Sequence, residues 1–311
     1  MRITVTGATG LLGTRLVAAL RAHGAEVTVL SRDPQRARAK LEPRTAQGGT
    51  LQTLPWNPLR ESAPTVALAG RDAVVHLAGE EVAQRWSESA KRAIRESRVL
   101  GTRNLVEGLR AIPDASARPA TLLSGSAVGY YGPHGEEPID EDAPPGNDFL
   151  AQVCVEWEAQ AAAAQELGMR VVQIRTGVVL DSDGGALAKM LPPFRLGVGG
   201  PVAGGRQYVS WIHPDDHIEL VRTALTDSRW SGPFNATAPA PQTNRELAHT
   251  LGRTLHRPAI LPVPGFALRA LYGGMAQIVT TGARVLPAKA LVLGFDFRYP
   301  KLEQALAAAL A

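Results

Sequence analysis

Residues 1–32 constrain the fold most strongly, because a glycine-rich turn there joins a strand pattern to a helix pattern. Residues 2–6 form a short β-branched run, and the segment Gly7-Ala8-Thr9-Gly10-Leu11-Leu12-Gly13 follows it directly. Apolar side chains at helical spacing then continue to Leu20, and residues 26–30 have the composition of a second strand. A glycine run between a strand and a helix at this position is typical of a β-α-β unit that binds a dinucleotide.

The glycines and the end of the second strand indicate which dinucleotide is bound. In such units one glycine permits the tight turn, one lets the backbone approach a pyrophosphate, and one lets helix and strand pack closely. An acidic residue after the second strand usually binds a free ribose 2′-hydroxyl, whereas an arginine accommodates a 2′-phosphate. This chain has Ser31 and Arg32 at that point, and Asp33 comes one residue later. The sequence therefore favours NADP(H) over NAD(H).

Composition excludes several classes of protein. The 311 residues carry a net charge of +4, with no block of Lys and Arg, so we expect no nucleic-acid partner. No run of about 18 apolar residues occurs, so we expect no membrane partner. Cys154 is the sole cysteine, which fits a reducing compartment, and we expect a cytoplasmic protein. No metal-ligand motif appears, so no metal is expected. The sequence does not decide between a monomer and a homodimer.

Strands and helices alternate over the first 180 residues. Residues 73–79, 121–124 and 170–179 are apolar strand patterns, and helices are expected at about 87–110 and 148–168. Residues 34–64 are rich in Arg, Gly, Gln and Pro, and we expect an irregular connection there with one short strand. Alternation of this kind predicts an α/β fold, a doubly wound parallel Rossmann sheet.

The pattern loosens after Leu180, where glycines become frequent. We therefore assign residues 1–180 to an NADP-binding Rossmann domain and most of residues 181–311 to a smaller substrate or lid domain. Segment 215–236 is a candidate for return to the main sheet.

An ordered set of motifs resembles one branch of the extended short-chain dehydrogenase/reductase superfamily. After GATGLLG come VVHLAGE, SRVLGT, SGSAVGYYG, IRTGVVL and GGRQYVSWIHPDD. The chain is most similar to the NAD(P)-dependent epimerase-like branch that is sometimes mislabelled as cell-division inhibitors. The C-terminal run from VPGFALRALYGGMA to FRYPKLEQAL is similar to that branch's extra domain of unknown function, expected at about 250–300.

The resemblance implies cofactor contacts along the whole Rossmann half. It places the pyrophosphate and its neighbours on the turn, the adenosine phosphate beside the second strand, and the rest of the cofactor along the third strand and the nicotinamide end. The implied residues are Gly7, Thr9, Gly10, Leu11, Leu12, Gly13, Ser31, Arg32, Leu77, Ala78, Gly79, Arg98, Val178 and Val179.

The chain departs from the superfamily at its acid/base pair. The superfamily uses a Tyr and a Lys four residues later on one helix face, and the Lys helps the Tyr to trade a proton. Here Phe149 stands where the Tyr is expected and Val153 where the Lys is expected. Neither side chain can transfer a proton.

Other residues are therefore candidates for the substrate site. The resemblance implies that Ser126 binds a substrate oxygen, and Tyr131 or Tyr130 is a candidate proton donor at the same sheet edge. Cys154 and His213 are weaker candidates, because core packing and a role at the domain seam explain them as well. Four residues of the glycine-rich region are candidate substrate contacts: Lys189, Arg206, Gln207 and Trp211.

Two functions remain compatible with these residues. The favoured one is an NADP(H)-dependent oxidoreductase or epimerase-like enzyme that acts on a small hydroxyl or carbonyl compound. The alternative is a non-catalytic NADP(H)-binding sensor or partner-binding protein that lost the Tyr and Lys.

Overall fold

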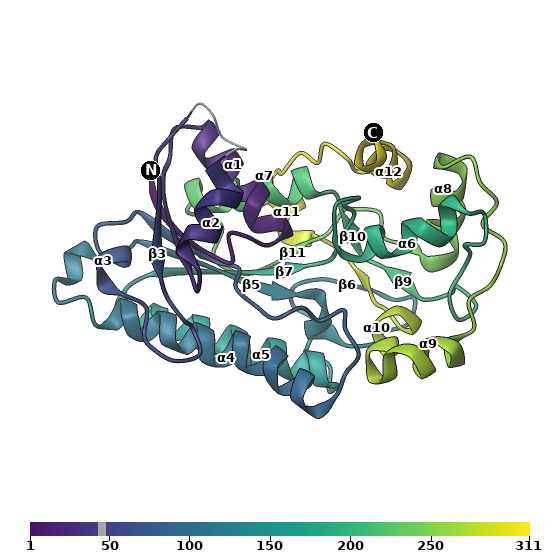
Figure 1. Ribbon diagram of the computed structural model, residues 1–311, viewed down its shortest axis with the longest axis horizontal. Helices are drawn as coiled ribbons and strands as arrows, with labels where there is room; N and C mark the ends of the chain where they lie inside the picture. The colour runs from purple at the N-terminus through teal and green to yellow at the C-terminus, as the bar shows by residue number, and fades with distance from the viewer. Residues whose placement is uncertain (43–47) are drawn as a thin grey trace.

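The computed structural model describes residues 1–42 and 48–311 and confirms the predicted α/β fold (Figure 1). Its centre is a seven-stranded sheet in which all neighbours run parallel. The strands lie in the spatial order β11 (Gly232–Ala236), β7 (Arg170–Thr176), β5 (Thr121–Ala127), β4 (Ala73–His76), β1 (Arg2–Thr6), β2 (Glu26–Ser31) and β3 (Leu51–Pro55).

Helices cover both faces of this sheet (Figure 1). One apolar cluster lies under α1 (Leu11–Ala22), α2 (Pro34–Leu41), α7 (Pro214–Thr226) and α11 (Ala288–Val292). The other lies under α3 (Thr65–Leu68), α4 (Glu88–Arg110) and α5 (Phe149–Ala162).

The strand residues alternate between these two clusters. In β4 the side chain of Val74 belongs to the α4 side and that of Val75 to the α1 side, and both are fully buried. In β5, Leu122 and Leu123 divide in the same way. Burial on both faces explains why these strands appear in the sequence as continuous apolar runs without polar alternation.

Two sequence expectations were wrong in detail. Residues 34–64 contain the one short strand expected, β3, which pairs with β2, but their first part is the helix α2, which was not expected. Asp33 starts α2 by accepting a hydrogen bond from the Arg36 N–H, and Pro34 takes the first helical position, where it needs no amide donor. The strand expected at 170–179 is interrupted at Gly177, where a Cβ would lie 2.9 Å from the Thr237 side chain.

The rest of the chain forms smaller elements beside the sheet. Their main apolar cluster contains residues of α6, α8 and α12. They are β6 (Pro138–Ile139), β8 (Val178–Val179), α6 (Gly185–Arg195), β9 (Tyr208–Val209), β10 (Trp211–Ile212), β12 (Gln242–Thr243), α8 (Asn244–Thr254), α9 (Gly265–Tyr272), α10 (Ala276–Thr280), β13 (Arg284–Val285) and α12 (Leu302–Leu310). Short 3-10 helices are η2 (Ala115–Ala117), η3 (Val128–Tyr131), η4 (Ala163–Leu167) and η5 (Gly273–Met275).

The C-terminal tail is fastened to the main sheet layer by one carboxylate. Asp216 in α7 accepts hydrogen bonds from the backbone N–H groups of Arg298 and Tyr299, at 2.8 and 3.0 Å. Asp216 lies inside α7, whose N-cap is His213, and the His213 imidazole accepts a hydrogen bond from the Asp215 N–H. Along the described residues, no helix is both long and apolar enough to cross a membrane.

His76 makes the stability of this fold depend on pH. The imidazole is fully buried at the end of β4 between the hydroxyls of Thr6 and Thr102, and burial lowers its pKa to about 4. Between that value and about 6.5 the unfolded chain binds more protons than the folded chain, so stability falls as the pH falls. We expect about 2 kcal/mol of this loss between pH 7 and pH 5 to come from His76.

The test is urea unfolding at both pH values for the wild type, for His76→Gln and for the exposed control His23→Gln. The pH-dependent difference should shrink by about 2 kcal/mol in His76→Gln alone. Equal pH dependence in all three proteins contradicts the prediction.

Candidate functional site

In the turn between β1 and α1, two glycines lie too close to neighbouring backbone atoms to carry a side chain. Gly7 has a φ of +68°, and a Cβ there would lie 2.5 Å from the carbonyl carbon of Leu77. A Cβ on Gly13 would collide with the Gly7 carbonyl oxygen and lie 2.7 Å from the Cα of Ala8. These glycines therefore let the turn and the start of α1 pack closely together. No side chain caps α1 at Gly10, so the amide groups at its start can bind an anion.

This turn forms one wall of a cavity of about 470 Å³ at the carboxyl ends of β1, β2 and β4. Of the residues predicted to bind the cofactor, those that line it are Gly7, Thr9, Gly10, Ser31, Arg32, Leu77, Ala78 and Gly79. Leu11, Leu12 and Gly13 form the first turn of α1 directly behind it. Parallel sheets bind nucleotides at this edge, so the placement suits a dinucleotide.

Three cationic side chains gather at the β2 end of this cavity. Arg32 was predicted, but Arg36 and Lys40 were missed because their helix was not expected. Lys40 donates a hydrogen bond of 2.8 Å from Nζ to the carbonyl oxygen of Thr9 and so joins α2 to the glycine turn. The signal was present in the sequence: Asp33 and Pro34 mark a helix start, and residues four apart share a helix face.

Arg98 lies beneath the cavity and holds the loop after β4. Its guanidinium donates to the carbonyl oxygens of Glu80 and Ile94, both at 3.1 Å, and lies 5.2 Å from the Trp157 ring. A Cβ on Gly79 would be 3.1 Å from this guanidinium, and burial lowers the pKa of Arg98. Arg98 thus positions the backbone that lines the cavity.

A second cavity of about 230 Å³ lies where η3, α5, α6 and the C-terminal elements meet, and we call it the apolar cavity. Phe149, the residue in place of the superfamily's Tyr, is part of its wall, as are Val178 and the predicted substrate contact Gln207. The ring of Phe149 packs edge-on against Trp86, with centroids 5.2 Å apart. Val179 lies next to Val178 in β8, which pairs with β10.

Ser126 and Tyr131 belong to a buried polar network. Ser126 donates to Glu158 at 2.6 Å, and Arg175 binds both carboxylate oxygens of Glu158 at 2.9 Å. Arg175 also donates to the Tyr131 hydroxyl at 2.9 Å, and that hydroxyl donates to Asn235 at 2.7 Å. The network connects β5, α5, β7, η3 and β11, so these side chains join elements that are distant in sequence.

This placement argues against proton transfer by either candidate tyrosine. Tyr131 is fully buried, its hydroxyl is bonded on both sides, and burial raises its pKa to about 12. Tyr130 lies under Arg175, whose guanidinium is 3.5 Å from its ring centroid. Neither ring is part of the apolar cavity wall. The Ser126 hydroxyl is likewise directed at Glu158.

Three predicted substrate contacts lie outside the apolar cavity. Lys189 forms an ion pair with Glu81 at 2.6 Å, which fastens α6 to the loop after β4. Trp211 is fully buried and donates from its indole nitrogen to the carbonyl oxygen of Ala240. Arg206 is exposed. These residues are near a glycine-rich loop in the sequence, but that proximity does not show which side chains face the cavity.

The weaker proton-transfer candidates also have structural roles. Cys154 is buried in α5, and burial raises the pKa of its thiol to about 12, with Glu158 adding to the effect. His213 caps α7 and packs against Tyr299, with ring centroids 3.9 Å apart and ring planes tilted by 41°. Within the described ranges, no group of three His, Cys, Asp or Glu side chains is arranged to hold a metal ion.

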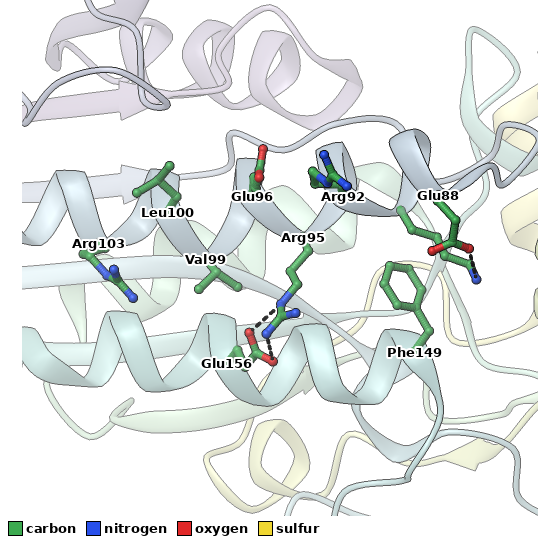
Figure 2. A pocket seen from close by; sticks show the side chains of 10 residues that line it. Glu88, Arg92, Arg95, Glu96, Val99, Leu100, Arg103, Phe149 and Glu156 are labelled. Atoms are coloured by element: carbon green, nitrogen blue, oxygen red, sulfur yellow. Dashed lines mark hydrogen bonds and ion pairs between the residues drawn. The ribbon is translucent and has the colours of Figure 1, made fainter.

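A larger groove of about 640 Å³ runs between α4 and α5 on the outer face of the sheet. Figure 2 shows Arg95 and Glu156 reaching across it, where they form an ion pair of 2.8 Å. Lys91 pairs with Glu88 and Arg103 donates to Gln160, so several charged groups of the groove are already bonded to protein. Phe149 closes its end and lines the apolar cavity on its other side (Figure 2).

Removing the charge of Glu158 should destabilise the protein strongly. Glu158→Gln leaves the buried Arg175 without its counter-charge, and we expect the free energy of unfolding to fall by about 3 kcal/mol. The matched control is Glu156→Gln on the same helix, whose exposed pair with Arg95 should contribute less than about 1 kcal/mol. Chemical unfolding curves of both variants check this, and equal losses contradict it.

Comparison with known proteins gives the family. The family model described as the NAD dependent epimerase/dehydratase family matches residues 3–236, and a domain of unknown function (DUF1731) matches residues 263–309. A relative from Arabidopsis thaliana, the chloroplastic homolog of epimerase family protein SDR39U1, is 43% identical over 99% of this chain and 86% of its own length.

Solved structures agree with this result. The crystal structure of human epimerase family protein SDR39U1 with NADPH is 33% identical, with a TM-score of 0.86 over 99% of both chains. A protein from Corynebacterium glutamicum described as a nucleoside-diphosphate sugar epimerase is also 33% identical, with a TM-score of 0.74 over 99% of this chain and 58% of that one. This chain therefore belongs to the NAD dependent epimerase/dehydratase family, in the group that resembles SDR39U1 and carries the extra C-terminal domain.

Proposed function

We propose that this protein is an NADP(H)-dependent oxidoreductase or epimerase-like enzyme that acts on a small hydroxyl or carbonyl compound. The observation that carries the proposal is the arrangement of the two cavities. A glycine-lined cavity with three cations lies at the ends of β1, β2 and β4, and the apolar cavity begins at Val128, just after β5. Because β4 and β5 are adjacent parallel strands, a dinucleotide that starts in the first cavity can extend toward the second.

The residues present fit NADP(H). The absence of a Cβ at Gly7 and at Gly13 lets the turn pack tightly against Leu77 and Ala8, and the start of α1, which no side chain caps, offers N–H groups to a pyrophosphate. When bound, the nicotinamide supplies or accepts a hydride. The protein's part is to hold the cofactor and substrate together, and the apolar cavity wall keeps water from the reacting atoms.

Arg32 and Arg36 support a preference for the 2′-phosphorylated cofactor. Both guanidinium groups belong to the cavity at the β2 end, where the adenosine ribose of a Rossmann cofactor lies. Guanidinium binds phosphate through paired hydrogen bonds. The human relative was crystallised with NADPH, which is in line with the same preference here.

Replacing these arginines should weaken NADPH binding selectively. We expect Arg32→Ala and Arg36→Ala each to raise the Kd for NADPH about tenfold, equivalent to about 1.4 kcal/mol, with little change for NADH. The matched control is Arg38→Ala, because Arg38 lies on the same helix but pairs with Glu42 outside the cavity. Fluorescence titration with both nucleotides measures this, and parallel losses for NADH and NADPH would sink the assignment.

Tyr208 is our candidate for the missing proton donor. It is the phenol in the apolar cavity wall, and its hydroxyl makes no hydrogen bond to any residue that the structure describes. The Arg284 guanidinium lies 5.4 Å from the Tyr208 ring centroid. Tyr208 thus combines access to the cavity with a free hydroxyl, which Tyr131 lacks.

Tyr208→Phe should lower kcat for reduction of a carbonyl substrate by about 10²- to 10⁴-fold, because a positioned acid contributes that much. The Kd for NADPH should not change, since Tyr208 lies outside the cofactor cavity. Tyr272→Phe, in α9 and outside the apolar cavity wall, is the control. The measurement is NADPH oxidation across a panel of carbonyl compounds, and unchanged rates in Tyr208→Phe rule out this role.

The loss of the superfamily's pair supports the alternative, a non-catalytic NADP(H)-binding sensor or partner-binding protein. Phe149 occupies the Tyr position, and Val153 in the Lys position is almost fully buried. Tight NADPH binding without turnover of any carbonyl or alcohol in the panel favours this alternative. For either function we propose a reducing compartment such as the cytoplasm and a small-molecule ligand, without a nucleic-acid or membrane partner.

A further inference from the structure

We propose that the apolar cavity takes an uncharged, largely apolar carbonyl or alcohol compound and does not take a nucleotide sugar. This inference rests on the proposed function, because it identifies the second ligand of the same site. It is carried by the charges, the hydrogen bonds and the size of the cavity.

The wall of the apolar cavity offers no cation to a phosphate. Among its described residues there is no Lys, Arg or His, and Asp148 is its one charged side chain. A diphosphate buried there would lack the Arg or Lys partners that normally compensate its charge, and it would also meet a carboxylate. The charge pattern therefore selects against anionic ligands.

Two of the helices at the cavity, α5 and α8, have N-termini that side chains already cap. Asp148 caps α5 by accepting a hydrogen bond from the Ala151 N–H at 2.8 Å. At the start of α8, Thr243 and Glu246 cap each other's backbone N–H groups. Side-chain oxygens thus already hold amide groups that otherwise bind anions at helix starts.

Most polar groups in the wall are bonded to protein. Ser210 donates to the Ala283 carbonyl oxygen and accepts from the Val285 N–H, each at distances below 3 Å. The amide nitrogen of Gln207 donates to two backbone carbonyl oxygens.

Two side chains of the wall keep donor groups that are free for a ligand. The Tyr208 hydroxyl and the side-chain amide nitrogen of Asn244 make no hydrogen bond within residues 1–42 and 48–311. A ligand therefore finds donors for one or two oxygens and apolar contact elsewhere.

Size and shape agree with a small apolar ligand. The volume of about 230 Å³ lies below the roughly 300 Å³ at which pockets for drug-sized ligands begin. Ile278 and Val279 in α10 line the cavity and are each 38% exposed, so its apolar wall continues to the surface. Transfer of an apolar compound from water into this cavity is favourable, whereas transfer of a nucleotide sugar is not.

The test compares three probes on the protein saturated with NADPH: neutral 2-acetylnaphthalene, its anionic counterpart 6-acetyl-2-naphthoate, and UDP-glucose. Isothermal titration calorimetry should give at least tenfold tighter binding for the neutral ketone than for either anion. Met190→Trp, which enlarges a side chain in the cavity wall, should weaken the ketone at least tenfold. Leu196→Trp, exposed just beyond α6, should leave its affinity unchanged.

Two results overturn the inference: binding of UDP-glucose as tight as that of the ketone, or ketone binding that Met190→Trp does not affect. Absence of ketone binding overturns it as well. A titration with NADPH alone distinguishes this failure from failure of the proposed function. If NADPH does not bind, the proposed function fails, and the ketone can still be titrated against the cofactor-free protein to test the cavity.

Discussion

The structure depends on the close contact between the first β-α turn and the end of β4. Gly7 permits it, since a side chain there would collide with the backbone of Leu77, and Gly13 lets the start of α1 lie directly against the turn. The same contact has two consequences. It seats α1 against the sheet, where Leu16 and Val17 become fully buried, and it exposes a backbone surface to the pyrophosphate expected there. The absence of side chains at these glycines thus serves both the packing of α1 and the binding of a ligand at this edge.

A buried ion pair connects the sheet to the C-terminal elements. Arg175 and Glu158 are both largely shielded from water, and their bidentate hydrogen bonds offset part of the cost of burying two charges. Burial alone lowers the pKa of Arg175, but the Glu158 carboxylate outweighs burial and raises that pKa above its ordinary value. Through Tyr131 and Asn235 the network reaches the Leu286 carbonyl oxygen. Residues that resemble a catalytic set in sequence therefore hold the fold together.

Much of the Rossmann half was predictable because its signals are local. A glycine run between a strand and a helix fixes the turn, and continuous apolar strands fix a sheet covered on both faces. The helix α2 was missed although Asp33 and Pro34 marked its start, because the polar composition that follows masked them. Arg36 and Lys40, which lie on that helix, were therefore not predicted as cavity residues. The apolar cavity was not predictable, because its wall combines Phe149, Tyr208 and Leu247 from separate segments.

The sequence by itself determined the fold class, the dinucleotide turn and the absence of the Tyr and Lys pair, since each depends on residues that are neighbours along the chain. Only the tertiary structure decided which partners the remaining hydroxyls have. In the folded chain, the Ser126 and Tyr131 hydroxyls are hydrogen-bonded to Glu158 and Arg175. The Tyr208 hydroxyl has no protein partner among the described residues. The physical reason is that a hydroxyl bonds to whatever folding brings within about 3 Å, and residues far apart in sequence supply those partners.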